Sequence, residues 1–268
     1  MKVQNKIIVV TGGGNGMGRE LVLALLSKGA SVAAVDINAS ALEETVALAG
    51  MNRANLATYT VNITDRALVE SLPEQVISRF GAVDGIINNA GVIQPFVKLK
   101  DLDYAAIDRV MNVNLFGTLY MTKAFLPHLL ARPEAHITNI SSMGGFLPVP
   151  GQTIYGAAKA AVKLLTEGLN SELLGTNVRV TVVFPGAIGT NIAANSGVMN
   201  TLQVKGGETS FKMLAPAKAA QLILEGIENN RYRVLVGSDS RFMDAIYRLN
   251  PQRAARFILN QMSSLLPQ

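Results

Sequence analysis

Hydrophobic residues along this chain form short uninterrupted runs that alternate with longer stretches in which apolar and polar positions recur at helical spacing. The short runs predict buried β-strands over residues 6–10, 31–35, 56–61, 83–87, 136–140, 179–184 and 233–236. The longer stretches predict helices over residues 20–26, 40–50, 65–80, 104–130, 155–174 and 217–228. Predominantly apolar strands that alternate with helices are typical of a parallel sheet covered on both faces. The pattern therefore predicts an α/β protein in which helices flank a doubly wound parallel sheet.

Three local features refine the predicted helices. Ser40 and Glu43 have the S-x-x-E form of a capping box, which predicts that a helix opens there. Pro73 lies inside the helix over 65–80, where its ring predicts a kink or a split. Asn114 is a polar residue inside a long apolar helical region, and its burial is costly unless its amide is hydrogen-bonded.

The C-terminal segment 239–268 carries two apolar stripes at helical spacing and is predicted to form a helical extension. The stripes comprise Phe242, Ala245, Ile246 and Leu249, then Ala255, Ile258, Leu259 and Met262 after an Asn250-Pro251 helix start. Arginines accompany both stripes, which leaves two hypotheses. The two helices close the pocket or pack on a neighbouring subunit, with the arginines solvated. Alternatively, they lie on an anionic membrane surface and admit a lipid-like substrate.

Composition narrows the class of protein. With 268 residues and 49% hydrophobic residues, the chain can bury a large core, and we expect one domain over residues 1–268. No cysteine is present, which excludes disulfides and thiol nucleophiles, and the two histidines, His128 and His136, suggest no metal site. The apolar run 7–10 is too short for a signal peptide, and no segment is long and uncharged enough to span a membrane. We therefore expect a soluble, cytoplasmic protein.

The positive charge is concentrated near the C-terminus. Of the net charge of +5, the segment from Arg231 onward contributes +4, with six arginines against two aspartates. A nucleic-acid-binding protein would spread its cations more widely and interleave them with aromatic residues that stack on bases. The sequence therefore argues against a nucleic-acid partner.

A glycine-rich turn follows the first strand. Thr11-Gly12-Gly13-Gly14-Asn15-Gly16-Met17-Gly18 fits the pattern T-G-x-x-x-G-x-G but not the literal G-x-G-x-x-G fingerprint. Such a turn lets backbone amides and a helix N-terminus approach a pyrophosphate. Asp36 follows the second strand, 18 residues beyond Gly18, where an acid hydrogen-bonds a ribose and repels a 2′-phosphate. Because residues 12–18 contain no Arg or Lys, we expect the cofactor to be NAD.

Tyr155 and Lys159 lie four residues apart in helix-forming sequence, so their side chains share one helix face. A nearby cation favours the phenolate and lowers the pKa of a tyrosine, which suits it to general acid–base catalysis. On its own such a pair is more often a core edge beside a solvated face. The order and spacing of the other motifs favour the catalytic interpretation.

With these motifs the chain resembles the short-chain dehydrogenase/reductase family, in its single-domain, Rossmann-fold branch, from Thr11 to about Gly237. The motifs that carry the resemblance are T-G-x-x-x-G-x-G at Thr11, N-N-A-G at Asn88, N-x-x-G at Asn114, Ser142, Y-x-x-x-K at Tyr155 and P-G-x-x-x-T at Pro185. Ser142 precedes Tyr155 by 13 residues, as in the family. The resemblance implies an NAD-dependent oxidoreductase that acts on a secondary alcohol or ketone.

The resemblance also assigns roles to four catalytic residues. Tyr155 would exchange a proton with the substrate oxygen, and Ser142 would hydrogen-bond that oxygen and orient it. Lys159 would hold the nicotinamide ribose and lower the pKa of Tyr155, while Asn114 would hold a water that completes a proton relay. Ser141, one residue out of register, is expected to face the other side of its strand.

The cofactor-binding residues implied by the same motifs extend over the glycine turn, the ends of four strands and the catalytic helix. They are Thr11, Gly12, Asn15, Gly16, Met17, Gly18, Asp36, Asn62, Ile63, Asn89, Ala90, Gly91, Tyr155, Lys159, Pro185, Gly186, Ile188 and Thr190. Asn62 departs from the family, which usually has an Asp there to meet the adenine. Asn keeps the hydrogen-bonding capacity without the charge, so we expect a small change of affinity.

Substrate and assembly are less sharply determined. We expect the loop 191–215 to cover the substrate and apolar side chains to line its pocket, namely Phe146, Leu147, Val149, Ile192, Val198 and Met199. The resemblance implies a homo-oligomer, a tetramer or a dimer, with the helices of Tyr104 and Tyr155 at an interface. One alternative is a dinucleotide-binding regulator or scaffold without turnover, against which the complete catalytic set argues. Another, a sugar-nucleotide epimerase, needs a larger C-terminal domain than the chain after Gly237 provides.

Overall fold

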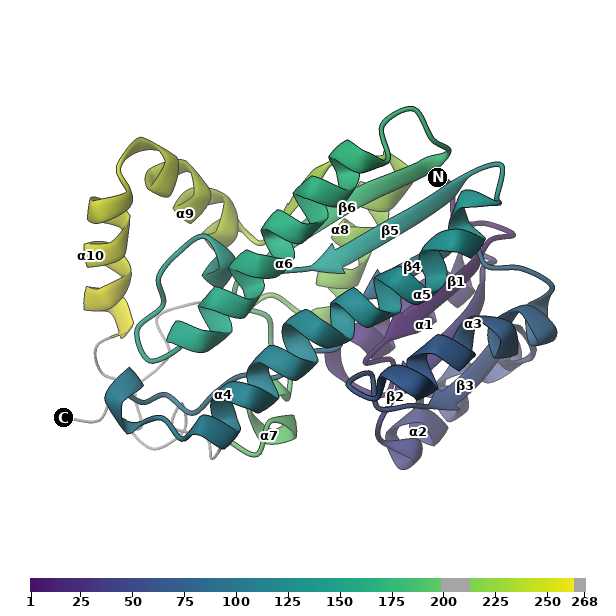
Figure 1. Ribbon diagram of the computed structural model, residues 1–268, viewed down its shortest axis with the longest axis horizontal. Helices are drawn as coiled ribbons and strands as arrows, with labels where there is room; N and C mark the ends of the chain where they lie inside the picture. The colour runs from purple at the N-terminus through teal and green to yellow at the C-terminus, as the bar shows by residue number, and fades with distance from the viewer. Residues whose placement is uncertain (199–212, 263–268) are drawn as a thin grey trace.

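The computed structural model describes residues 1–198 and 213–262, and its centre is one parallel seven-stranded sheet (Figure 1). The strand order is β3-β2-β1-β4-β5-β6-β7. The strands are β1 (Ile7–Thr11), β2 (Ser31–Asp36), β3 (Leu56–Thr60), β4 (Gly85–Asn88), β5 (Ala135–Ile140), β6 (Val178–Pro185) and β7 (Arg233–Val236). The predicted doubly wound parallel sheet is confirmed.

Helices cover both faces of the sheet. They are α1 (Gly16–Ser27), α2 (Ala39–Ala49), α3 (Arg66–Phe80), α4 (Tyr104–Met111), α5 (Thr118–Leu130), α6 (Thr153–Glu172), α7 (Ile192–Asn195), α8 (Pro216–Glu228), α9 (Ser238–Leu249) and α10 (Pro251–Met262). Helices α1, α2 and α8 bury apolar side chains against one face, and α3, α5 and α6 against the other. The strand order reverses between β1 and β4, and in open α/β sheets ligands bind beyond the carboxyl ends of the strands at such a point.

Two of the local predictions about helices need correction. Helix α2 is capped by Asn38 and not by a Ser40–Glu43 box, because the Asn38 side chain accepts a hydrogen bond from the Ala41 N–H at 3.1 Å. The Ser40 hydroxyl donates to that same Asn38 oxygen at 2.7 Å, so it supports the cap without being it. Helix α3 runs from Arg66 to Phe80 without a break, and the buried Pro73 does not split it. The buried face of α3 packs against α5, and this packing keeps the helix continuous although a proline disfavours a helix interior.

The long helical region 104–130 is confirmed, with a wider π-helical stretch between α4 and α5 over Asn112–Gly117. Such bulges are frequent at functional sites. Inside it the buried Asn114 side chain bonds both backbone groups of Val92, accepting from the N–H at 2.9 Å and donating to the C=O at 2.8 Å. The hydrogen bonds that this buried amide needs are therefore supplied by a residue 22 positions earlier in the chain.

The C-terminal helices α9 and α10 lie at one edge of the molecule, drawn in yellow in Figure 1. The predicted stripes are confirmed in part, because Ile246, Ile258 and Met262 pack in one cluster with Leu147. Phe242 and Leu249, by contrast, are 55% and 86% exposed. Met243 and Ala254 are buried in their place, because the helices pack against the segment after β5, which the periodicity of the extension alone does not reveal. Among the described residues no helix combines the length and apolarity that crossing a membrane requires.

Candidate active site

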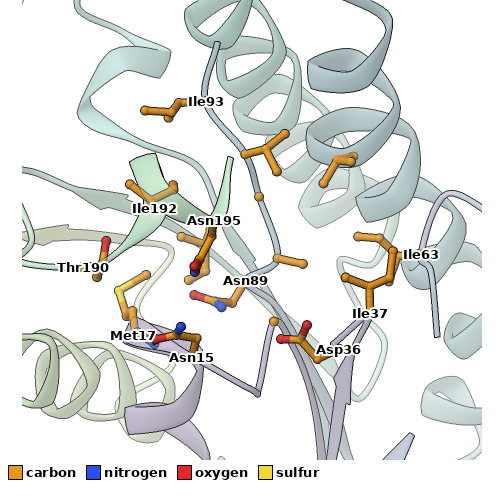
Figure 2. Close-up of a pocket in the computed structure, with 18 of the residues that line it drawn as sticks. Asn15, Met17, Asp36, Ile37, Ile63, Asn89, Ile93, Thr190, Ile192 and Asn195 are labelled. Atoms are coloured by element: carbon orange, nitrogen blue, oxygen red, sulfur yellow. The ribbon is translucent and has the colours of Figure 1, made fainter. Parts of the chain in front are cut away.

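A cleft of about 640 Å³ lies at the carboxyl ends of the central strands (Figure 2). Side chains from the glycine turn, from the ends of β2, β4 and β5, from α6 and from the loop after β6 line it. Every site residue predicted from the sequence lines this cleft except Thr11 and Asn114. The predicted positions, spread over some 180 residues, are therefore brought together at one place.

The glycine turn places the N-terminus of α1 at the floor of the cleft. The Asn15 side chain accepts from the Gly16 N–H at 2.6 Å and caps the helix. A Cβ on Gly18 would lie 1.9 Å from the Gly12 carbonyl oxygen, so only glycine permits this close approach. Helix α1 has no acidic side chain in its first turn. The turn therefore offers a cradle with a positive dipole end, which suits a pyrophosphate.

Asp36 ends β2 at the rim of the same cleft, beside Ile37 and Ile63 (Figure 2). One carboxylate oxygen accepts from the Gly14 N–H at 2.9 Å and the other from the Asn38 N–H at 3.0 Å. These two backbone donors leave further lone pairs on the carboxylate for a ribose. The local geometry thus holds a negative charge at the position that the sequence predicts for ribose recognition.

Arg19 directly follows the glycine turn, and its Nε and Nη2 groups are engaged within the protein. Its Nε donates to the Gly14 carbonyl oxygen at 2.9 Å, and its Nη2 pairs with the Glu44 carboxylate at 2.7 Å. The side chain therefore clamps the turn between β1 and α1 to helix α2. It is not oriented as a free guanidinium toward the cleft.

Thr11 and Asn89 join the first strand to the fourth. The Thr11 hydroxyl accepts from the N–H groups of Asn89 and Ala90 at 2.9 and 3.0 Å. The Asn89 side-chain amide donates to the Thr11 carbonyl oxygen at 3.0 Å. Thr11 thus lies behind the cleft wall and holds the loop that lines it.

Asn114 also lies behind the wall. Its carboxamide is fully used by Val92, and its Oδ1 lies 2.8 Å from where a Cβ on Gly91 would stand. The same Gly91 position is 3.3 Å from the Lys159 Nζ. The bare backbone at Gly91 therefore allows Asn114 and Lys159 to approach one another.

Lys159 is buried and has no acidic partner among the described residues. Its ammonium donates to the Ile140 carbonyl oxygen at the end of β5, at 2.9 Å. Burial lowers the pKa of Lys159 to about 8, because desolvation penalises the charged form. This side chain can therefore change its protonation state near neutral pH.

Tyr155 and Ser142 both line the cleft, and the Lys159 Nζ lies 5.9 Å from the centre of the Tyr155 ring. Burial raises the pKa of Tyr155 above its ordinary value, and the interaction with Ser142 opposes that rise. The lowering of the Tyr155 pKa by Lys159 that the sequence predicts is therefore not found in the protein alone, because desolvation dominates. Ser141 bonds the Lys159 carbonyl oxygen at 2.7 Å and is occupied in that contact.

The loop after β6 closes the cleft opposite the glycine turn. A Cβ on Gly16 would lie 3.3 Å from the Thr190 Cβ, so the two loops approach each other across the cleft. The loop is held from behind, because Ala187 donates its N–H to the Asp239 carboxylate at 2.6 Å and Gly189 donates to the Leu214 carbonyl oxygen at 3.0 Å. Pro185, Gly186 and Ile188 line the cleft between these anchors.

The predicted apolar pocket needs partial correction. Of its members only Ile192 lines the cleft; Phe146 and Leu147 pack with the C-terminal helices, and Met199 lies outside the described residues. Val149 and Val198 do not line it either. Further cleft residues are marked by no motif, namely Val35, Ile37, Val61, Thr64, Val92, Ile93, Arg109, Asn112, Val113 and Ile140. Only their positions next to or near the motif residues could have indicated them. Among the described residues no group of three or more His, Asp or Glu side chains could hold a metal ion.

Comparison with known proteins agrees with this geometry. The family model described as short chain dehydrogenase matches residues 6–200. The protein SadH of Mycobacterium tuberculosis is 34% identical over 270 residues, which cover 98% of each chain.

Solved structures show the same fold. A short-chain dehydrogenase/reductase from Burkholderia phymatum in complex with NAD matches with a TM-score of 0.84 and 27% identity, over 94% of this chain and 95% of that one. A short-chain dehydrogenase from Burkholderia cenocepacia in complex with NADP matches with a TM-score of 0.80 and 28% identity, over 97% and 99%. From its motifs, its cleft and these relatives, the chain belongs to the short-chain dehydrogenase/reductase family of nicotinamide-dependent oxidoreductases.

Proposed function

We propose that this protein transfers hydride between NAD and an apolar secondary alcohol or its ketone. The observation that carries the proposal is that Tyr155 and Ser142 line one cleft, with the buried Lys159 on the same face of α6 as Tyr155. A tyrosine with a tunable pKa beside a hydroxyl donor is suited to proton exchange with a carbinol oxygen.

The residues of the cleft fit a dinucleotide. At Gly16, which lines the cleft, a Cβ would stand 3.3 Å from the Thr190 Cβ and narrow the space beside the capped N-terminus of α1. Gly12, Asn15, Gly16 and Met17 would hold the pyrophosphate end. The other predicted cofactor residues would hold the adenosine and nicotinamide ends, namely Asp36, Asn62, Ile63, Asn89, Ala90, Gly91, Pro185, Gly186, Ile188 and Thr190. When bound, the nicotinamide supplies or accepts the hydride.

The protein's own residues would manage the proton. Tyr155 would take the alcohol proton during oxidation and return it during ketone reduction. Ser142 would donate a hydrogen bond to the same substrate oxygen and orient it, which stabilises developing alkoxide character. Lys159, when protonated, favours the Tyr155 phenolate electrostatically. Asn114 would act from behind, by holding the Val92 backbone beside Lys159.

Asp36 is the basis for preferring NAD over NADP. A carboxylate at the ribose repels a 2′-phosphate, and the Nε and Nη2 groups of the Arg19 guanidinium are engaged by Gly14 and Glu44. The two Burkholderia structures hold NAD in one case and NADP in the other, so the family alone does not decide the cofactor. The preference is therefore a property that we assign to Asp36 and its surroundings.

The substrate end of the cleft supports an apolar substrate. Val92, Ile93 and Ile192 line it, and α7 lies within the segment 191–215 that we propose as the substrate-covering loop. Residues 199–212 of that loop lie outside the described residues. We assign the extension 239–268 to closing the flank of this site, because α9 and α10 pack on Leu147 just after Ser142.

We further propose that the protein is a homo-oligomer, a tetramer or a dimer. Tyr104 on α4 and Leu164 on α6 are 84% and 67% exposed, and the exposed Phe116 belongs to the same helical layer. Apolar side chains exposed on adjacent long helices are typical of a subunit interface. Analytical ultracentrifugation that finds only monomer at assay concentration would reject this assembly.

Turnover tests the proposed function directly. A panel of aliphatic and aromatic secondary alcohols is incubated with NAD, and NADH formation is followed by absorbance. Tyr155→Phe keeps the ring and removes the hydroxyl, so NADH should still bind while turnover falls at least ~10²-fold. A Tyr155→Phe variant with near-normal activity would contradict the assignment. If wild type binds NADH but oxidises no alcohol and reduces no matching ketone, the regulator hypothesis replaces this one.

A further inference from the structure

Gln94 is a fully buried polar residue that the catalytic motifs do not include. It lies in the loop between β4 and α4, immediately after the cleft residues Val92 and Ile93, but does not itself line the cleft. A buried carboxamide is costly unless it is hydrogen-bonded, and all of the polar atoms of this one are used. Each of its partners lies at the start of α6.

The Gln94 side chain caps α6 from 60 residues away. Its Oε1 accepts from the N–H groups of Ile154 and Tyr155 at 2.8 and 3.0 Å, and its Nε2 donates to the Gly151 carbonyl oxygen at 3.0 Å. The residue at the N-cap position itself, Gln152, makes no side-chain cap. Gln94 therefore satisfies orphan amides that other helices satisfy with a neighbouring Ser, Thr, Asp or Asn.

One of the two capped amides belongs to Tyr155, the third residue of α6. The backbone that carries the phenol is thereby tied to the loop segment 92–94. The same segment is tied to Asn114 through Val92. It is also tied to the beginning of the substrate loop, because the Ile93 N–H donates to the buried Ser196 hydroxyl at 3.0 Å.

We propose that Gln94 is a positioning residue for Tyr155: it fixes the first turn of α6 so that the phenol meets Ser142 and the substrate oxygen. This inference rests on the proposed function of Tyr155. Without the cap, the amides of Ile154 and Tyr155 lose the one acceptor that they share, at the point where the phenol is attached. A displacement of about 1 Å at a reacting group can lower the rate roughly 10²-fold. Gln94 can therefore have a large effect on turnover through the position of Tyr155, without contacting the substrate.

Gln94→Met tests the proposal, because methionine fills a similar volume but accepts no strong hydrogen bond. Amide hydrogen exchange of Ile154 and Tyr155 should accelerate at least about tenfold, and kcat should fall at least about tenfold. The Kd for NADH, set largely by the glycine turn and Asp36, should stay within about twofold. Gln94→Glu keeps an acceptor for both amides but loses the donor to the Gly151 carbonyl oxygen, so it should restore exchange protection and kcat in part. If Gln94→Met does not fold, Gln94→Asn, which withdraws the amide by one methylene, carries the same prediction.

Gln152→Met is the matched control. Gln152 is also buried and donates to the Gln94 carbonyl oxygen at 2.8 Å, but it does not contact the amides of Ile154 and Tyr155. It should lose stability without the loss of kcat. Equal losses of kcat in Gln152→Met and Gln94→Met, or unchanged exchange of the two amides in Gln94→Met, would overturn the proposal. A wild-type protein without alcohol turnover would reject the proposed function alone, since the exchange measurement does not depend on it.

Discussion

The Asp239 carboxylate accepts a hydrogen bond from the Ala187 N–H at 2.6 Å, and this contact ties the C-terminal extension to the loop that lines the cleft. Asp239 lies in the first turn of α9, where a negative charge is favoured by the helix dipole. Next to it, the Ser240 hydroxyl donates to the Phe184 carbonyl oxygen at 2.8 Å. A Cβ on Gly186 would stand 2.2 Å from the Asp239 oxygens, so the glycine of the P-G motif makes room for this contact.

Removing this contact should weaken dinucleotide binding from outside the cleft. Asp239→Ala leaves the Ala187 N–H without its acceptor, which costs on the order of 2 kcal/mol for a charge-assisted bond and loosens the loop. We expect the affinity for NADH, measured by fluorescence titration, to fall about tenfold, and Asp239→Asn to retain most of it. Asp244→Ala is the control, because Asp244 lies on the same helix but pairs with Arg233 and Arg248. An equal loss in that variant would show that the effect is a general loosening of α9.

Asp36 should determine the choice between NAD and NADP. We expect kcat/KM to favour NAD at least about tenfold, and Asp36→Ala to narrow that ratio by a similar factor, or about 1.4 kcal/mol. Glu44→Gln is an informative companion, because it removes the ion-pair partner of Arg19 without touching the ribose position. Wild-type protein that uses NADP as well as NAD would contradict the assignment of the preference to Asp36.

Lys159 should make stability depend on pH. Its pKa is about 8 in the folded protein, below the ordinary value of 10.5, so the unfolded chain holds the proton more tightly between these values. The free energy of unfolding should therefore rise as the pH increases from 8 toward 10, and the contribution of Lys159 to this rise is about 2 kcal/mol at most. Urea unfolding of wild type and Lys159→Met at pH 7.5 and 10 measures the difference. Between pH 7.5 and 10, the free energy of unfolding should rise more for wild type than for Lys159→Met. An equal change in the two proteins would argue against a lowered pKa of Lys159.

Vesicle binding should distinguish a structural role of the C-terminal helices α9 and α10 from a membrane-binding role. Their inner face packs on Leu147, and Arg248 is paired with Asp244, so we expect the extension to serve the site and the assembly. Wild-type protein should then not co-sediment with vesicles of anionic phospholipid at low salt. Binding that disappears when Arg248, Arg253 and Arg256 are replaced by Gln would support the membrane hypothesis instead, because those changes leave the packed face intact.

Much of the fold and the site follows from local sequence. The strand runs, the glycine turn, Asp36 and the Tyr155–Lys159 spacing each depend on residues close together in the chain, where periodicity and side-chain chemistry act directly. The carboxyl ends of parallel strands meet at one edge of the sheet, which is why motifs far apart in sequence lie around one cleft.

What the tertiary structure decided depends on contacts between distant segments. Asn38, and not Ser40, caps α2. Helix α3 continues through Pro73, because its buried face packs against α5. The C-terminal extension buries Met243 and leaves Phe242 exposed. The hydrogen bonds of Asn114 with Val92 and of the Tyr155 amide with Gln94 likewise join segments that are distant in sequence. A buried polar group takes whichever partner the fold brings within about 3 Å, and no spacing along the chain encodes that choice. The sequence by itself determined the sheet, its crevice and the chemistry gathered there, whereas only the packing of distant segments decided how those side chains are held.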